Sequence, residues 1–153
     1  MDPNARYTSV QSPSTTEQIA EMRDVPYREA VGSLMYLALA IRPDIAYAIA
    51  VLSHFSANPG SAHWEAVKQV FKYLKGMKEL WLTYGMFEGG ERLLGYSNAD
   101  GGMAEDCHAI SGYVFLINGS AMTWSSKKQD IVSLSTTESE YVAAAHSAKE
   151  ALC

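Results

Sequence analysis

The sequence has few cysteines, no long hydrophobic run and no excess of positive charge. Only Cys107 and Cys153 are cysteines, which excludes a disulfide framework and a four-thiolate zinc site and favours a reducing intracellular setting, cytoplasmic or nuclear. The longest mostly apolar run, residues 31–41, is well short of the roughly 20 residues that a membrane span needs. The polar N-terminus lacks the apolar stretch of a signal peptide. The sequence predicts neither a secreted mini-protein nor a membrane protein.

The formal net charge is −5, which argues against autonomous binding of nucleic acid through its phosphates. Any contact with nucleic acid has to be local or metal-assisted. Two local groups of basic residues are present: Lys68, Lys72, Lys75 and Lys78, and the pair Lys127 and Lys128. A solvated surface is the simpler interpretation of both groups, and a phosphate-binding track is the alternative.

The first half of the chain has helical periodicity after a polar start. Residues 1–25 have no apolar period and predict an extended arm. Pro26 and the spacing of apolar residues behind it predict a helix over 27–41. A second helix is expected over about 45–55, ending before Asn58-Pro59-Gly60. A third should begin at Ser61 as its N-cap and stop near Gly76.

The second half changes to the period and residue types of strands. Strands are predicted over 80–84, 92–97, 112–117, 121–126 and 131–134. Asn118-Gly119 between two of these runs predicts an antiparallel hairpin. The last helix should begin at Ser135, where the spacing from Ser135 to Glu138 is typical of a capping box. The sequence therefore predicts a mixed α+β or α/β chain: a three-helix segment followed by antiparallel strands and one helix.

A group of four carboxylates is the one set of residues in the sequence whose arrangement suggests a chemical site. Asp100 follows a predicted strand, Asp106 lies in the next loop, and Glu138 and Glu140 open the last helix. Acids gathered at a sheet end and a facing helix suit Mg²⁺, although solvated or capping roles are the simpler interpretation. The adjacent Cys107 and His108 lack a second pair at zinc-ligand spacing. The sequence has no Gly-x-Ser-x-Gly elbow and no phosphate-binding Gly-x-x-x-x-Gly-Lys loop.

Several motifs together resemble the Pol polyprotein of copia-type LTR retrotransposons. In the first half they are residues 25–38 (VPYREAVGSLMYLA), 42–48 (RPDIAYA), 58–60 (NPG), 63–64 (HW) and 72–76 (KYLKG). In the second half, residues 95–100 (GYSNAD), 111–115 (SGYVF), 124–129 (WSSKKQ) and 134–141 (LSTTESEY) resemble the ribonuclease H domain of that family. The resemblance covers nearly the whole chain.

The resemblance implies a fragment across a domain boundary. Residues 1–25 would be the arm, 26–78 a thumb-like or connection segment from the end of the reverse transcriptase, and 79–153 a truncated ribonuclease H-like unit. The Asp-Asp pair of the family's polymerase site is absent from the chain, so polymerase activity is excluded. The implied partners are an RNA–DNA hybrid, which Lys68, Lys72, Lys75, Lys127 and Lys128 would contact, and other Pol segments.

The family's ribonuclease H site holds two Mg²⁺ on one Asp after the first strand, one Glu on the first helix and two later Asp residues. The first Asp corresponds to Asn98, an amide without negative charge and a poor ligand for two divalent cations. Asp100 belongs to the same motif two residues further on. Glu140 matches the helix Glu better than Glu138, which the cap occupies. The two later acids would lie beyond Cys153, so tight Mg²⁺ binding and hydrolysis by this chain alone are not expected.

Two alternatives remain from the sequence. In one, the chain supplies half of a ribonuclease H site that missing sequence or another polypeptide completes. In the other, it is a domesticated nucleic-acid-binding or protein-interaction module that kept the scaffold and lost the chemistry. If the chain does stop at residue 153, the strand that carries residues 97–100 is expected to be an unpaired edge.

Overall fold

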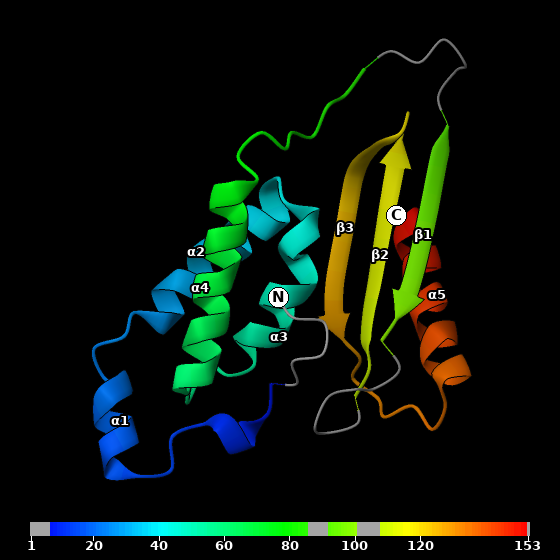
Figure 1. The fold of residues 1–153 in the computed structure, drawn as a ribbon. Helices are drawn as coiled ribbons and strands as arrows, with labels where there is room; N and C mark the ends of the chain where they lie inside the picture. The colour runs from blue at the N-terminus through cyan, green and yellow to red at the C-terminus, as the bar shows by residue number, and fades with distance from the viewer. Residues whose placement is uncertain (1–6, 86–91, 101–107, 153) are drawn as a thin grey trace. The chain divides into compact units, whose positions relative to one another are not determined.

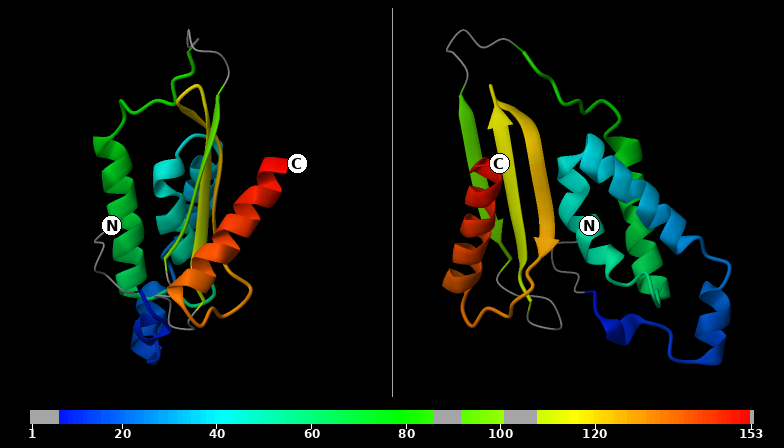
Figure 2. Two further views of the ribbon diagram at one scale, coloured as in Figure 1. Left: turned by 90° about the vertical axis from the view of Figure 1, so that its right-hand side faces the viewer. Right: turned by 180° about the vertical axis from the view of Figure 1, so that it is seen from behind.

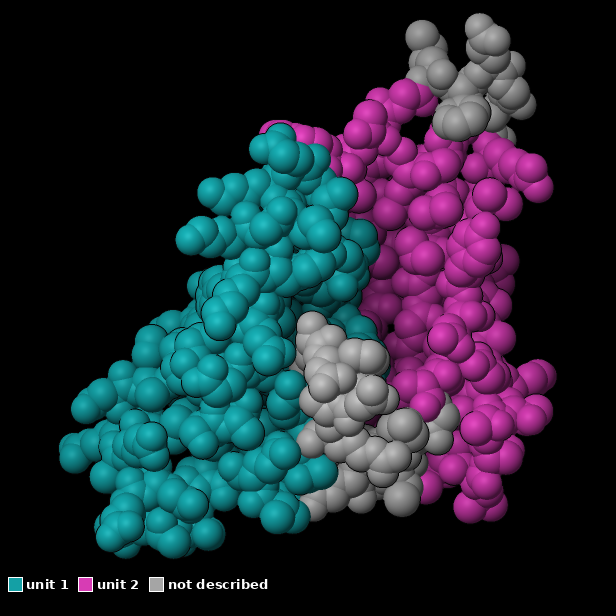
Figure 3. Space-filling view, in the orientation of Figure 1, with its two compact units in different colours: residues 1–80 teal, residues 81–153 magenta. Residues whose placement is uncertain are grey.

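The computed structural model describes residues 7–85, 92–100 and 108–152. The chain divides into two compact units, residues 1–80 and 81–153, which Figure 3 colours separately. The described residues contain five α-helices and one three-stranded antiparallel sheet (Figure 1), so the mixed α+β prediction is confirmed. Within these residues no helix has the length and apolar character needed to cross a membrane.

Unit 1 is helical. Its elements are η1 (Ser9–Gln11), α1 (Thr16–Met22), α2 (Tyr27–Ala40), η2 (Pro43–Ile45), α3 (Ala46–Ser53) and α4 (Ser61–Gly76). The predicted helices over 27–41 and from 61 to 76 are confirmed within a residue or two. Gly60, and not Ser61, is the N-cap residue of α4.

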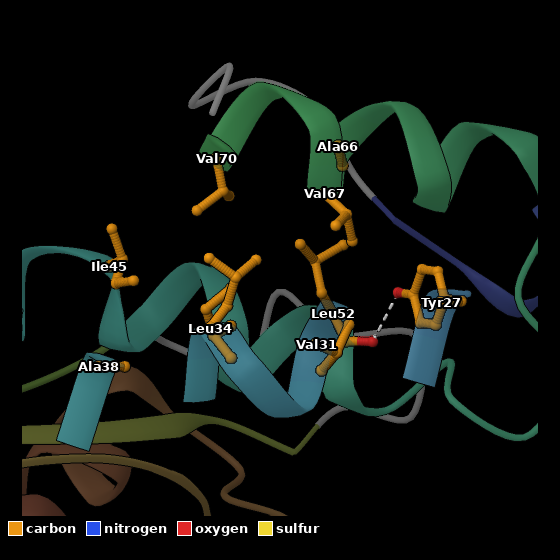
Figure 4. Close-up of a cluster of buried hydrophobic side chains, with 10 residues drawn as sticks. Tyr27, Val31, Leu34, Ala38, Ile45, Leu52, Ala66, Val67 and Val70 are labelled. Atoms are coloured by element: carbon orange, nitrogen blue, oxygen red, sulfur yellow. Dashed lines mark hydrogen bonds between the residues drawn. The ribbon is translucent and has the colours of Figure 1, made fainter. Parts of the chain in front are cut away.

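One apolar core holds unit 1 together. The spacing of residues 27, 31, 34 and 38 gives α2 a buried stripe, which packs against buried residues of η2, α3 and α4 (Figure 4). Leu34, Leu52 and Val67 are 0% exposed. The hydroxyl of Tyr27 donates to the carbonyl of Leu52 at 2.8 Å, so the phenol keeps a partner although it is buried. Burial also raises the pKa of Tyr27 above its ordinary value, and this side chain stays neutral.

Polar contacts join η2 and its N-cap residue Arg42 to the end of α4. The Arg42 guanidinium donates to both carboxylate oxygens of Asp44, with a shortest distance of 2.7 Å. The hydroxyl of Tyr73 donates to Asp44 at 2.9 Å, and Arg42 also donates to the Met77 carbonyl at 3.3 Å. The guanidinium holds the pKa of Asp44 below its usual range. The RPD and KYLKG motifs therefore serve the fold of unit 1.

The prediction of extended backbone throughout residues 1–25 is wrong for the part that the structure describes. Residues 9–11 form η1 and residues 16–22 form α1. Capping hydrogen bonds stabilise the start of α1, although its sequence has no apolar periodicity. Thr15 Oγ1 accepts from the amide of Gln18 at 3.3 Å, and the Gln18 side chain accepts from the amides of Ser14 and Thr15. Gln11 also packs tightly on Gly60, where a Cβ would lie 1.9 Å from the Gln11 carbonyl oxygen.

Unit 2 is a small sheet with one helix. Its elements are β1 (Leu93–Ala99), β2 (Ile110–Ile117), β3 (Ser120–Lys128) and α5 (Thr136–Leu152), and the strand order is β1-β2-β3. The hairpin prediction is confirmed, because Asn118 and Gly119 turn between β2 and β3 with φ of 50° and 80°. Figure 2 shows α5 on one face of the sheet.

Two predicted strands are absent from the described part of unit 2. Residues 80–84, of which 81–84 belong to unit 2, and residues 131–134 have no strand structure. Instead, Thr83 accepts a hydrogen bond from the Ser120 hydroxyl, and the Tyr84 hydroxyl donates to the Ala121 carbonyl at 2.6 Å. Leu134 donates its amide to Glu138 at 2.7 Å and so takes part in capping α5. Short apolar runs do not by themselves distinguish a strand from a connection that packs on one.

Candidate functional site

The carboxylate of Glu140 meets the end of β1. Its Oε2 accepts a hydrogen bond from the amide of Ala99 at 3.1 Å, across 41 residues of sequence. The amide of Asp100 donates to the Ile110 carbonyl and therefore points toward β2. Amides alternate in direction along a strand, so the Ala99 amide points to the edge of β1 that has no strand beside it. Glu140 thus links α5 to the motif 95–100.

Asp100 extends the hydrogen bonding between β1 and β2 by one residue beyond the end of β1. Its Oδ1 accepts from the amide of Ile110 at 2.7 Å, and its own amide donates to the Ile110 carbonyl at 3.2 Å. Asp100 and Glu140 therefore each use one carboxylate oxygen to accept a hydrogen bond from a backbone amide. Each has a second oxygen, but neither carboxylate is simply a solvated surface acid.

Asn98 lies on the other side of the strand. It pairs with Gly112, whereas Ser97 and Ala99 pair with Tyr113 and Ser111. The contacts of Ser111 with Gln129, and of Gln129 with the Ser139 carbonyl, identify the face that α5 covers. Alternation along β1 then directs Asn98 to the opposite face. The structure brings Glu140 to the strand of Asn98, but not to the face of Asn98.

These residues do not fit a two-Mg²⁺ centre. Asn98 offers one neutral oxygen, and it lies on the face away from Glu140. No group of three or more His, Cys, Asp or Glu side chains at metal-binding distance occurs among the described residues. Asp106 and Cys107, which the sequence analysis also considered, lie outside the described residues.

Gln129 is the residue of this region that the site prediction did not include. It is 2% exposed, and its amide group donates to the Ser111 hydroxyl at 2.8 Å and to the Ser139 carbonyl at 2.9 Å. Its side-chain oxygen accepts from Ser133 at 3.0 Å. Gln129 therefore fixes α5 to β2 and sets where Glu140 lies. A buried glutamine at the end of the WSSKKQ motif gives only a weak signal in the sequence, because Gln is usually exposed.

The basic residues have ordinary surface surroundings. Lys68, Lys72 and Lys75 share one side of α4 by their spacing, and Lys68 is paired with Glu65. Lys127 lies 3.9 Å from Asp130, with both side chains largely exposed. Exposed pairs of this kind contribute little to stability, on the order of 0–1 kcal/mol.

Comparison with known proteins decides the family. The chain is 46% identical over 140 residues to the retrovirus-related Pol polyprotein from transposon TNT 1-94 of Nicotiana tabacum, which covers 90% of this chain and 10% of that protein. It is 40% identical over 128 residues to the corresponding polyprotein from transposon RE2 of Arabidopsis thaliana, covering 81% of this chain and 8% of that protein. The chain belongs to the family of retrovirus-related Pol polyproteins from transposons.

A third relative has nearly the same length as this Pol-family chain. The secreted RxLR effector protein 161 of Plasmopara viticola is 44% identical over 135 residues, which are 86% of this chain and 92% of the relative. The chain thus spans about a tenth of the two Pol polyproteins but most of this shorter relative. No protein-family model matches the chain. No solved structure matches it either.

Proposed function

We propose that this chain comes from the boundary between the reverse transcriptase and the ribonuclease H domain of a copia-type Pol polyprotein. In this proposal unit 1 is a helical, thumb-like or connection segment. Unit 2 is the opening part of a ribonuclease H-like domain, whose family substrate is the RNA strand of an RNA–DNA hybrid. The observation that carries the proposal is the contact of Glu140 with Ala99 at 3.1 Å, because it joins the helix Glu of the family motif to the strand of the motif 95–100.

The same geometry supports a lack of hydrolysis by this chain alone. Two-metal hydrolysis needs several anionic oxygens to hold two cations beside the attacking water. The position that matches the family's first Asp is the neutral Asn98, on the face of β1 away from Glu140. Glu140 and Asp100 each give one oxygen to a backbone amide. We therefore propose a ribonuclease H-like scaffold without its own metal centre.

A hybrid-cleavage assay tests this proposal. A labelled RNA strand annealed to DNA is incubated with the purified chain in Mg²⁺ and, separately, in Mn²⁺. We expect no cleavage above the protein-free reaction, and none from Asn98→Asp, because one added carboxylate on the opposite face does not complete the site.

The positive control is a longer chain that continues through the later strands of a related Pol polyprotein, with Asn98→Asp included. We expect this chain to cleave the hybrid and Glu140→Ala to abolish its activity. Cleavage by the 153-residue chain that Glu140→Ala abolishes would contradict the lack of activity. An inactive longer chain, folded by circular dichroism, would contradict the ribonuclease H-like assignment itself.

A further inference from the structure

The N-terminal segment of unit 1 packs on the turn that leads into α4. This segment, residues 7–13, includes η1 and is called the strap below. Gly60 in the turn is buried, and a Cβ there would lie 1.9 Å from the Gln11 carbonyl oxygen. The Asn58 side-chain amide also donates to the Pro13 carbonyl at 3.4 Å. The strap therefore fits the turn closely because Gly60 has no side chain.

His63 contacts both the strap and the turn. It is 0% exposed, and its ring centroid lies 6.2 Å from that of Tyr7 in the strap. On another side its ring stacks on Phe55, just after α3. Its Nδ1 accepts a hydrogen bond from the Gly60 amide at 2.9 Å. One imidazole thus caps the start of α4 and packs against the strap.

The surroundings of His63 suit only the neutral imidazole. Because Nδ1 accepts a hydrogen bond, Nε2 carries the single proton, and Nε2 has no hydrogen-bond partner among the described residues. A second proton on Nδ1 would face the N–H of Gly60 and create a buried charge, which is costly unless it is paired. Burial accordingly lowers the pKa of His63, although the Thr8 backbone raises it in part.

The groups packed around His63 supply no negative charge in the described structure. From the strap, Tyr7 faces the imidazole, and tyrosines ordinarily ionise only near pH 10. From the end of α3, Phe55 does not titrate. On α4 itself, Glu65 is exposed and engaged in an ion pair. His54, next to Phe55 in the sequence, is exposed and offers a second histidine for comparison.

We propose that the strap is a pH-sensitive device: it stays docked on the start of α4 while His63 is neutral, and it detaches when His63 takes up a second proton, before unit 1 unfolds. The buried members of the unit 1 core lie between Tyr27 and Val70, and Tyr7 is only partly buried against them. Segments with little buried apolar area open most readily. Because these contacts all lie within unit 1, the device is independent of the ribonuclease H-like assignment.

Hydrogen exchange of the full chain, resolved by NMR, tests the detachment. The reporters are the amides of Gln11 and Ser12, which donate within the strap at 3.1 and 3.0 Å, and the Gly60 amide. Their rates are expressed as protection factors, which correct for the direct effect of pH on exchange. If His63 in the detached state titrates near 6.5, protection should fall about 5- to 25-fold from pH 7 to pH 5. We expect His54→Gln to retain this fall and His63→Gln, which keeps an acceptor for Gly60, to lose it.

Local opening is distinguished from unfolding by the level of protection. We expect the strap amides to be at least tenfold less protected than the amides of α2 at each pH. Equal protection of the strap and α2 would mean that the strap opens only with the whole unit, which would overturn the device. Strap amides that are unprotected at pH 7, a protection that does not change with pH, or an equal fall in His63→Gln would overturn it as well.

A reciprocal test removes the strap and measures His63. Gly60 has φ of −97° and ψ of 171°, which alanine adopts readily, so Gly60→Ala disturbs the strap more than the turn. If the proton detaches the strap, loss of the strap must favour the proton. We expect the pKa of His63, titrated by NMR, to rise in Gly60→Ala toward the ordinary value of about 6.5. The control is Gly32→Ala, where a Cβ meets nothing within 4 Å. A Gly60→Ala chain with α2 and α4 still protected and the pKa of His63 unchanged would contradict the proposed coupling.

Discussion

Unit 1 and unit 2 are stabilised by different means. Unit 1 buries ten apolar residues from four elements in one cluster. The buried apolar residues described in unit 2 are Ala109, Ile110, Phe115 and Ala143, and beside them lie buried Ser111, Gln129, Ser139 and Ser147. Helices with a periodic apolar face can bury these faces against one another, so unit 1 forms its core from its own residues. A three-stranded sheet with one helix depends more on specific polar contacts, which stabilise only while every group is paired.

The largest expected effect is the loss of a core side chain in unit 1. Leu52 is 0% exposed and its carbonyl holds the Tyr27 hydroxyl. We expect Leu52→Ala to lower the free energy of unfolding by about 2–5 kcal/mol, because it leaves a cavity between α3 and its neighbours. Urea denaturation followed by circular dichroism measures it. Leu39→Ala, at a residue 67% exposed on α2, is the matched control and should change stability by less than about 0.5 kcal/mol.

The next effect concerns the polar centre of unit 2. Gln129→Ala removes the donor shared by the Ser111 hydroxyl and the Ser139 carbonyl. We expect a loss of about 1–3 kcal/mol, since buried partners are left unsatisfied. Hydrogen exchange should show the amides of β2 and α5 losing protection while α2 and α4 keep theirs. Gln69→Ala, an exposed glutamine on α4, provides the control. Equal loss of protection in both units would argue against their separate stabilisation.

The sequence predicted α2, α4 and the hairpin because each is specified by neighbouring residues. The stripe from Tyr27 to Ala38 and the Asn118-Gly119 turn need no information from elsewhere in the chain. The cap at Ser135 was also predictable, and the structure confirms that Ser135 accepts from the Glu138 amide at 3.2 Å. The Glu138 side chain reaches further back than expected, to the Leu134 amide at 2.7 Å.

The remaining features depend on contacts that are distant in sequence. A Cβ at Gly95 would lie 2.5 Å from the Phe115 ring, so a larger residue there would require that ring to shift, and this proximity depends on the pairing of β1 with β2. The positions of Asn98 and Glu140 on β1 likewise require the pairing of β1 with β2 and the anchoring of α5 by Gln129. The motif identified the residue types of the site, but it contained no information about which face each residue occupies.

A smaller effect is expected at the start of α5. Ser135→Ala removes the side-chain acceptor of the Glu138 amide. Loss of such a cap costs about 1 kcal/mol. We expect the free energy of unfolding to fall by this amount and the first turn of α5 to exchange its amides faster. Because Glu138 also bonds Leu134, the double change Ser135→Ala, Glu138→Ala should cost more than either alone. A double variant as stable as the single one would show that the two contacts are not independent parts of the cap.

The smallest effect near neutral pH is expected at His63 of unit 1. This side chain is 0% exposed, and its ring stacks on that of Phe55 with 4.0 Å between the ring centroids. Its Nδ1 accepts a hydrogen bond from the Gly60 amide at 2.9 Å. Within the described residues its Nε2 has no hydrogen-bond partner. Burial lowers the pKa of His63, and the Thr8 backbone raises it in part. No charged group contributes to this shift, and Tyr7, with its ring 6.2 Å away, is the titratable residue facing the imidazole from the N-terminal segment.

Protonation of His63 is incompatible with this arrangement, because a protonated Nδ1 cannot accept the Gly60 amide. A folded pKa below the unfolded value of about 6.5 means that the unfolded chain binds the proton first. The stabilising contribution is therefore complete above pH 6.5 and is lost as the pH falls toward the lowered folded pKa. We expect the urea midpoint to fall between pH 7 and pH 5, and to fall less in His63→Gln, which keeps an acceptor for Gly60 but does not titrate. His146→Gln, at an exposed position on α5, should retain the wild-type pH dependence, and an equal pH dependence in His63→Gln would assign the acid sensitivity to other groups.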